Sequence, residues 1–366
     1  MYHRVVIGLC ACLLGALAPG VTWGCSFCPP DPGPSLLKQL DSASAAVLAE
    51  LISAPQPDST SPVSRYRISL VLKGDKRIEP GDIIDVPLNV QSPLGSVHLF
   101  FSGGETVKWR NPLGVSPQAR HFLQLASKLP TVDDDSSLEV RCQRLAFMLP
   151  YLISQDSQIA RSAYGEFAAA PNAAVKQLKP ILNHRMLMAW IELEAPSAQN
   201  RRLLFTLLGV CRHREDLPFV KAALDDRLAS NKLGELDAII ATYLTLAGSA
   251  GLDEIDRRLL RPADIPLAAR RAAVGALRFH VDNETVIEKK RGIASCRLLL
   301  DDPKSADYVI GDFARWEDWD SLDAILALRS EVAQNRWLKQ PILSYLESCP
   351  LPAAQSALAA ILQSNP

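Results

Sequence analysis

Two cysteines near the start of the chain, Cys25 and Cys28 in the stretch WGCSFCPP, are the first residues whose type and spacing could carry chemistry. A thioredoxin-type redox couple needs a helix that begins at the first cysteine and lowers its pKa, but Pro29 and Pro30 follow at once. A structural zinc site needs two further Cys or His ligands at short spacing, and the next histidine along the chain is His98. We therefore expect a disulfide at this pair, with metal binding and thiol redox chemistry as alternatives.

A second group combines arginine with large aromatic side chains in the motif RWEDW, which contains Arg315, Trp316 and Trp319. Tryptophan and arginine are enriched at the centres of protein interfaces. Arg278 and His280 lie near the end of another expected helix and fit the same kind of surface. We take these five residues as candidates for partner binding. The alternative is that the tryptophans join neighbouring helices, since large aromatic side chains stabilise most when they are buried.

No known catalytic motif accompanies these groups. The sequence contains no His-Glu-x-x-His, no Gly-x-Ser-x-Gly, no phosphate-binding glycine loop and no dinucleotide fingerprint. His184 and His213 stand near expected helix ends without a metal-binding spacing, and the acidic run at 133–135 lacks the spaced oxygen ligands of a calcium loop. We therefore expect a protein that is not an enzyme and has neither a cofactor nor a metal site.

Residues 1–24 have the pattern of a secretory signal peptide. Arg4 precedes an apolar run at 5–18, and small residues follow at positions that include Gly20 and Gly24. The run is shorter than the roughly 20 apolar residues that span a membrane. We expect cleavage after one of these glycines and an exported protein, periplasmic or extracellular, that has no membrane span after cleavage.

Charge is balanced over the 366 residues, with 39 Lys and Arg against 40 Asp and Glu and a net charge of -1. Nucleic acids and anionic membranes are attracted by a strong positive field, which this composition does not supply. The sequence therefore gives no reason to expect a nucleic-acid partner, and it predicts no particular oligomeric state.

Four cysteines lie inside apolar helical patterns, where we expect buried thiols: Cys142, Cys211, Cys296 and Cys349.

The part of the chain from 25 to 115 carries short β signals. The run at 45–53 is mostly apolar, and the run at 64–73 alternates apolar and polar residues. Two more short runs follow, near 82–90 and 95–104, with glycine-containing turns between them. We expect a small antiparallel barrel or sandwich at 25–115.

From residue 116 to the end, the apolar period changes from two to about 3.6, as in amphipathic helices. Ser136 or Ser137 is expected to cap one of the first helices. Further on, helices come in pairs, such as 197–211 with 214–226, and each pair spans about 30–40 residues, which is typical of helical repeats. We expect a HEAT-like α-solenoid at 116–366 behind the β domain, an α+β multidomain protein, with an irregular helical bundle as the alternative.

Several stretches resemble a family of secreted bacterial HEAT-repeat-like proteins that has no established activity. They include LPFVKAALDDRL, DAIIATYLTLAGSAGLDEI, YLESCPLPAAQ and the more specific RWEDW, in the same order over roughly 25–360. The resemblance implies export, a small β domain and a helical repeat array.

The β part also resembles netrin-type and metalloprotease-inhibitor-type OB domains, through its cysteine-led start and a strand that ends in VLKG. In the inhibitor family a Cys-x-Cys start chelates the zinc of the protease. Here the spacing is Cys-x-x-Cys, and the many disulfides of that family are absent.

These features together favour an exported, non-enzymatic scaffold that binds a protein or peptide through a helical repeat surface. Two alternatives come from other classes of function. One is inhibition of a metalloprotease by the β domain, and the other is thiol redox chemistry at the Cys-x-x-Cys pair.

Overall fold

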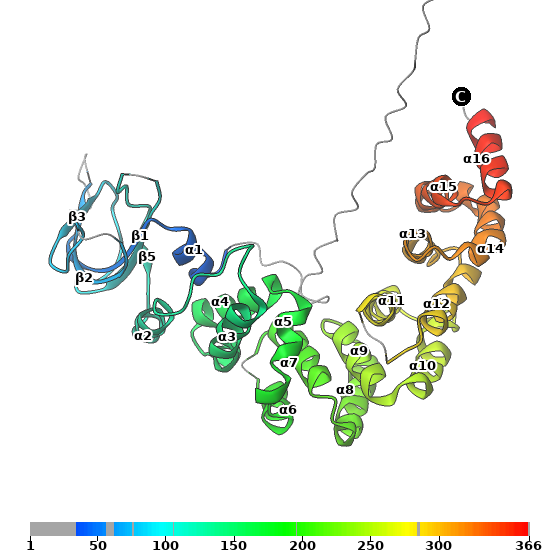
Figure 1. The fold of residues 1–366 in the computed structure, drawn as a ribbon, viewed down its shortest axis with the longest axis horizontal. Helices are drawn as coiled ribbons and strands as arrows, with labels where there is room; N and C mark the ends of the chain where they lie inside the picture. Colours follow the sequence, from blue (N-terminus) through cyan, green and yellow to red (C-terminus); the bar gives the residue numbers. More distant parts are fainter. Residues whose placement is uncertain are drawn as a thin grey trace, which may run out of the picture.

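The computed structural model describes residues 34–55, 62–74, 77–104, 106–194, 196–283 and 286–364. The expected signal peptide and the Cys25–Cys28 pair lie outside the described residues. Figure 1 shows a β-sheet at one end of the molecule and helices that follow one another along an arc to the other end.

The described strands are β1 (Ala45–Ser53), β2 (Ser64–Lys73), β3 (Ile83–Val86), β4 (Val97–Ser102) and β5 (Leu113–Gly114). The α-helices are α1 (Leu36–Ser42), α2 (Pro117–Ala126), α3 (Leu138–Met148), α4 (Ser157–Ala169), α5 (Asn172–Gln177), α6 (His184–Glu192), α7 (Ala198–Cys211), α8 (Leu217–Ser230), α9 (Leu236–Ala247), α10 (Ser249–Ile255), α11 (Leu267–Asn283), α12 (Lys289–Arg297), α13 (Asp307–Arg315), α14 (Leu322–Ala327), α15 (Lys339–Ser348) and α16 (Pro352–Ser364).

The five strands form one antiparallel sheet in the order β3-β2-β1-β4-β5. β3 and β5 are its two edges, so the sheet is open where the sequence predicts a closed barrel. The mixed α and β fold class is confirmed. β1 is the central strand and is buried on both faces, which explains why its apolar residues do not alternate with polar ones.

The two faces of the sheet belong to different cores. One face has a small core of its own, made of Val47, Ala49, Leu51, Tyr66, Ile68, Ile84, Val86 and Phe100. The other face packs on α1 and α2 through Ala46, Leu48, Leu99 and Phe101, and there it joins the core that continues through the helices. The main core thus runs across residue 115, where the sequence predicts a domain boundary.

The helices after α7 lie in two rows along the arc. Figure 1 shows α9, α11, α13 and α15 on its inner side and α8, α10, α12 and α14 on its outer side. Within the inner row, α9 packs between α7 and α11, and α13 packs against α15. α9 is buried around its whole circumference, as its sequence LDAIIATYLTLA requires, because a helix that is apolar on all sides must be covered by its neighbours.

The helix ends follow ordinary capping chemistry. Ser137 precedes α3, and its Oγ accepts a hydrogen bond from the backbone N–H of Val140 at 3.3 Å, which confirms the N-cap expected there.

None of the helices in the described part of the chain combines the length and the apolar character that crossing a membrane requires.

Candidate functional site

Arg315 and Trp316, two of the residues singled out in RWEDW, lie at the end of α13 and bind α11. The Trp316 side chain is buried, with 7% of the residue exposed, and its indole Nε1–H donates to Asp282 Oδ1 at 2.7 Å. Arg315 donates to Asp282 Oδ2 at 2.6 Å and to Asp312 Oδ1 at 2.9 Å. These contacts join α11 to α13, and we call the group the α11–α13 junction.

The other three candidates do not all belong to this junction. Arg278 donates to Asp312 Oδ2 at 2.7 Å and therefore belongs to the same junction. Trp319 is half-buried against the ring of Tyr345, with 5.5 Å between ring centroids. His280 has no exposed surface, and its Nε2 lies 2.9 Å from a backbone carbonyl oxygen of α9. The structure therefore groups Arg278, Arg315 and Trp316, and it places His280 in the core, out of reach of a partner.

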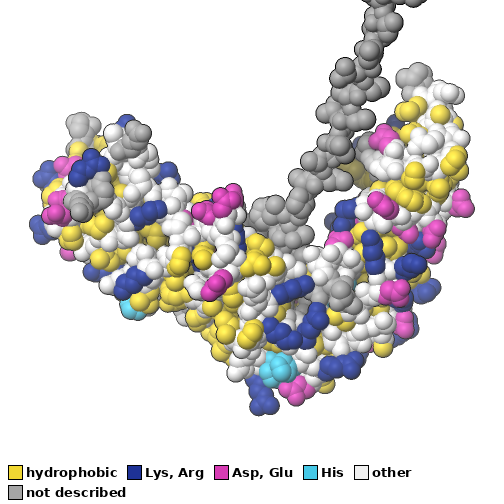
Figure 2. Space-filling view, in the orientation of Figure 1, with side chains coloured by type: hydrophobic (Ala, Val, Ile, Leu, Met, Phe, Trp, Pro, Cys, Tyr) yellow, Lys and Arg dark blue, Asp and Glu magenta, His cyan; other side chains and the backbone are white. Residues whose placement is uncertain are grey.

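A pocket of about 230 Å³ lies between α5, α7, α9 and α11, and it shares α11 with that junction. It is lined by Asn172, Lys176, Lys179, Thr206, Gly209, Val210, Arg212, Ala241, Thr242, Thr245 and Phe279. We call it the basic pocket, because it has two lysines and one arginine and, among the described residues that line it, no acid. Figure 2 shows Lys and Arg side chains gathered over this middle part of the arc, around α7 and α9.

The floor of the basic pocket depends on the close approach of α7 and α9. A Cβ at Gly209 would lie only 3.3 Å from Thr242 Oγ1, so a larger residue there would require Thr242 to shift by a few tenths of an ångström. Thr206, Thr242 and Thr245 each donate their hydroxyl proton to a backbone carbonyl, at 3.0, 2.8 and 2.8 Å. Because these donors are in use, the threonines present methyl groups and acceptor oxygens, and a ligand's negative charge has to be bound by the cations.

The three cations stand at helix ends. Lys176 is in the last turn of α5, where its Nζ donates to the backbone oxygen of Asn283 at 3.1 Å, and Lys179 follows in the short 3₁₀ helix Lys179–Ile181. Arg212 comes directly after α7 with a φ of 58°, a left-handed conformation that few non-glycine residues adopt. This conformation ends α7, and Arg212 lines the pocket instead of continuing the helix.

A buried thiol lies next to Arg212 in the sequence. Cys211 precedes Arg212 and is buried, and burial together with the negative charge of Asp216 raises the pKa of its thiol to about 11. The thiol is therefore protonated at neutral pH and is a weak nucleophile. Positive side chains around an apolar floor are suited to a ligand that carries a carboxylate beside an apolar group.

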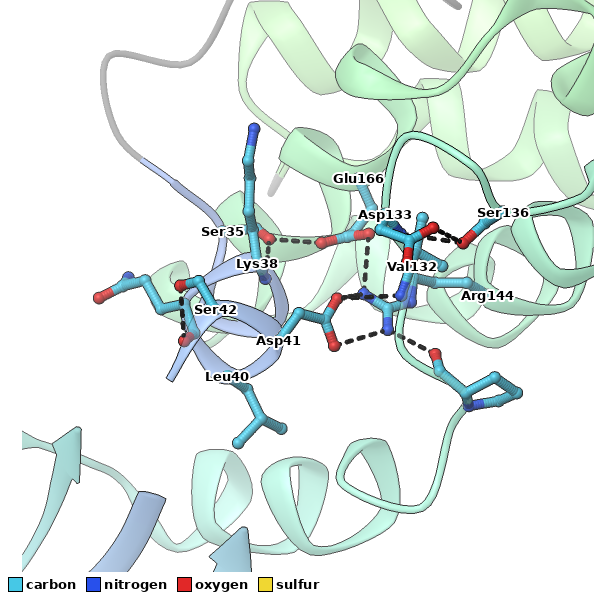
Figure 3. A network of polar contacts seen from close by, with 12 residues as sticks. Ser35, Lys38, Leu40, Asp41, Ser42, Val132, Asp133, Ser136, Arg144 and Glu166 are labelled. Atoms are coloured by element: carbon cyan, nitrogen blue, oxygen red, sulfur yellow. Dashed lines mark hydrogen bonds and ion pairs between the residues drawn. The ribbon is translucent and has the colours of Figure 1, made fainter. Parts of the chain in front are cut away.

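A further polar cluster, drawn in Figure 3, joins the N-terminal helix to the helical part. Arg144 on α3 donates to both carboxylate oxygens of Asp41 on α1, at 2.5 and 3.1 Å, and to the backbone oxygen of Pro130 at 2.7 Å. Glu166 on α4 lies 3.6 Å from the same guanidinium and is bound by the hydroxyl of Ser35. Burial raises the pKa of Glu166. The cluster is enclosed and links α1, α3 and α4, so its role is structural.

Sequence patterns did not single out the three cations of the basic pocket. Lysine and arginine near the C-terminal end of a helix are favoured by the helix dipole and need no function. The signal that could have found Lys176, Lys179 and Arg212 is their recurrence at the ends of successive elements, where neighbouring helices bring their ends together.

The chain was compared with protein-family models, with curated proteins and with solved structures, and none of the three comparisons found a match.

Proposed function

We propose that this is a non-enzymatic binding protein, an α-solenoid of HEAT-like hairpins that holds an acidic peptide segment of a partner protein in the basic pocket. The observation that carries the proposal is the lining of that pocket, in which Lys176, Lys179 and Arg212 surround an apolar floor and no described lining residue is acidic. Charge-assisted hydrogen bonds from such groups to a carboxylate are about twice as strong as neutral ones.

The size of the pocket supports a peptide side chain over a free small molecule. Pockets for drug-sized ligands have volumes of about 300–1,000 Å³, and this one has about 230 Å³. One apolar side chain can rest against Phe279 and Val210 while an adjacent Asp or Glu meets the cations. The segment proposed is therefore one in which acidic and apolar residues are neighbours.

The proposed place of action is outside the cytosol. This part of the proposal depends on the signal-peptide pattern at residues 1–24. The inhibitor and thiol-redox alternatives depend on Cys25 and Cys28, outside the described residues, and no contact described above favours them.

Fluorescence anisotropy with a labelled peptide of alternating glutamate and leucine tests the proposal. A matched peptide with lysine in place of glutamate is the first control and should not bind. Lys179→Gln and Arg212→Gln should each weaken binding by about tenfold, which corresponds to about 1.4 kcal/mol. Lys128→Gln, a change at an exposed lysine outside the pocket lining, should leave the affinity unchanged.

The double variant Lys179→Gln/Arg212→Gln decides the outcome. If it binds the acidic peptide as tightly as the natural protein does, the basic pocket is not the binding site. Binding that is equally strong for the lysine peptide would also contradict the proposal, because charge would then play no part.

A further inference from the structure

Beside the end of α7, His184 meets a second histidine and two acids from the short segment 213–216. His184 is the first residue of α6, and His213, Glu215 and Asp216 lie between α7 and α8. The imidazole rings of His184 and His213 stack with 4.0 Å between centroids and 12° between planes. One ligand atom from each of His184, His213 and Glu215 lies within 4.8 Å of the others.

Asp216 orients the first of these histidines. Its Oδ1 lies 2.8 Å from His184 Nδ1, which leaves His184 Nε2 on the side of Glu215, 3.4 Å from Glu215 Oε1. Metal-ligating histidines are almost always held in this way, with the second ring nitrogen bound to a carboxylate or carbonyl.

Asp216 also supplies an independent sign that the cluster is more than a surface ion pair. The residue is buried, with 2% exposed, and its Oδ2 has no hydrogen-bond partner in the described part of the chain. A buried carboxylate oxygen without a partner is unfavourable. The positive charge that a bound cation would bring to His184 would offset the negative charge of this carboxylate.

We propose that His184, His213 and Glu215 form a binding site for a divalent transition metal such as Zn²⁺, with Asp216 as the positioning residue. Two imidazoles and one carboxylate are a donor set that zinc accepts, and they leave a fourth position for water or a ligand.

The exposure of the three ligands fits this assignment. The His184 side chain is 16% exposed and is held by Asp216, whereas the side chains of His213 and Glu215 are 49% and 64% exposed. Zinc–ligand bonds of about 2.0–2.2 Å require ligand atoms closer together than 4.8 Å. Rotamer changes of His213 and Glu215 can close that gap, because about half or more of each side chain is exposed.

The site does not depend on the proposed peptide-binding function, and a separate measurement tests it. The full chain, without a histidine tag and freed of metal by a chelator, is titrated with Zn²⁺ in a calorimeter and with Co²⁺ in a spectrophotometer. We expect one zinc per chain and a visible absorption band for the bound Co²⁺. His213→Gln and Glu215→Gln change exposed side chains and should each lower zinc affinity by tenfold or more. Asp216→Asn, a change to the positioning residue, should lower it by about 10–100-fold.

Two control variants separate this site from other metal ligands in the chain. His121→Gln removes an exposed histidine on α2 and should leave zinc affinity unchanged. Cys25→Ser/Cys28→Ser removes the cysteine pair and should also leave it unchanged. Absence of zinc binding, binding that survives His213→Gln undiminished, or binding lost only in the cysteine variant would each overturn the proposal.

Discussion

At the α11–α13 junction Arg278 and Arg315 both face Asp312, whereas the basic pocket is lined by three cations and no acid among its described residues. Both regions carry cationic side chains, and both include residues of α11. In the junction the charges are offset within the protein, and the result is a contact that holds two helices together. In the pocket the described lining residues bring three cations together around an apolar floor. The same positive charge can therefore join two helices or line a pocket, depending on which groups the fold places beside it.

The largest effect is expected from breaking the junction. Trp316→Ala removes a buried indole and leaves Asp282 with one donor fewer, so it should lower the free energy of unfolding by about 3–4 kcal/mol. Urea unfolding followed by circular dichroism measures the change. Trp337→Ala, at a residue that is 67% exposed, is the matched control and should change stability by less than about 0.5 kcal/mol. Equal stability of Trp316→Ala and the natural protein would show that the junction does not hold the helices together.

An effect of intermediate size tests whether a carboxylate bound by cationic side chains stabilises the helical part outside the junction. Glu254 on α10 accepts from Lys221 Nζ at 2.6 Å, from Tyr243 Oη at 2.6 Å and from Arg258 Nη1 at 3.0 Å. These contacts, with the Lys221 hydrogen bond the largest, lower the pKa of Glu254 to about 2.

Because the folded-state pKa lies below the unfolded one, the stabilisation is complete above about pH 4.5 and is lost as the pH falls toward 2. The loss should amount to about 2 kcal/mol, measured by urea unfolding at a series of pH values. Glu254→Gln should be less stable at neutral pH and should show a weaker dependence on acid. The same acid dependence in natural protein and variant would mean that other carboxylates are responsible.

The smallest effect separates stability from binding in the basic pocket. Arg212 has a left-handed φ of 58°, and glycine adopts that conformation without the steric cost that a side chain brings. Arg212→Gly should therefore raise the free energy of unfolding slightly, by about 0.5 kcal/mol, because the added freedom of glycine in the unfolded chain offsets part of the gain. The same variant should bind the acidic peptide more weakly. A loss of stability greater than about 1 kcal/mol would show that contacts of the Arg212 side chain within the protein stabilise the fold.

Local features of the fold could be predicted well. The run 45–53 was expected to be a strand and is β1, and the stretch 197–211 was expected to be a helix and contains α7, capped by Ser197. A largely apolar run and a capping side chain each depend on a few neighbouring residues. The positions of such a strand and such a helix can therefore be predicted from one sequence. The closed barrel was wrong, because whether the edge strands β3 and β5 meet depends on how the whole sheet curves.

The candidate sites could be predicted much less well. Tryptophan and arginine at RWEDW were the conspicuous residues, and the structure uses Trp316 as a buried contact. No sequence pattern singled out Lys179 or Arg212, and His184 and His213 had no metal-binding spacing. No local pattern marks residues that become neighbours only through the packing of separate helices.

By itself, the sequence determined where strands give way to helices and which faces are apolar, because periodicity, capping and turn chemistry are properties of neighbouring residues. Only the tertiary structure decided which charges meet an opposite charge. Asp312 reaches Arg278 and Arg315, and Asp216 reaches His184, because helix packing sets the distances between side chains that lie far apart in the chain. Electrostatic interactions fall off with that distance, and so the roles of these residues follow from the fold.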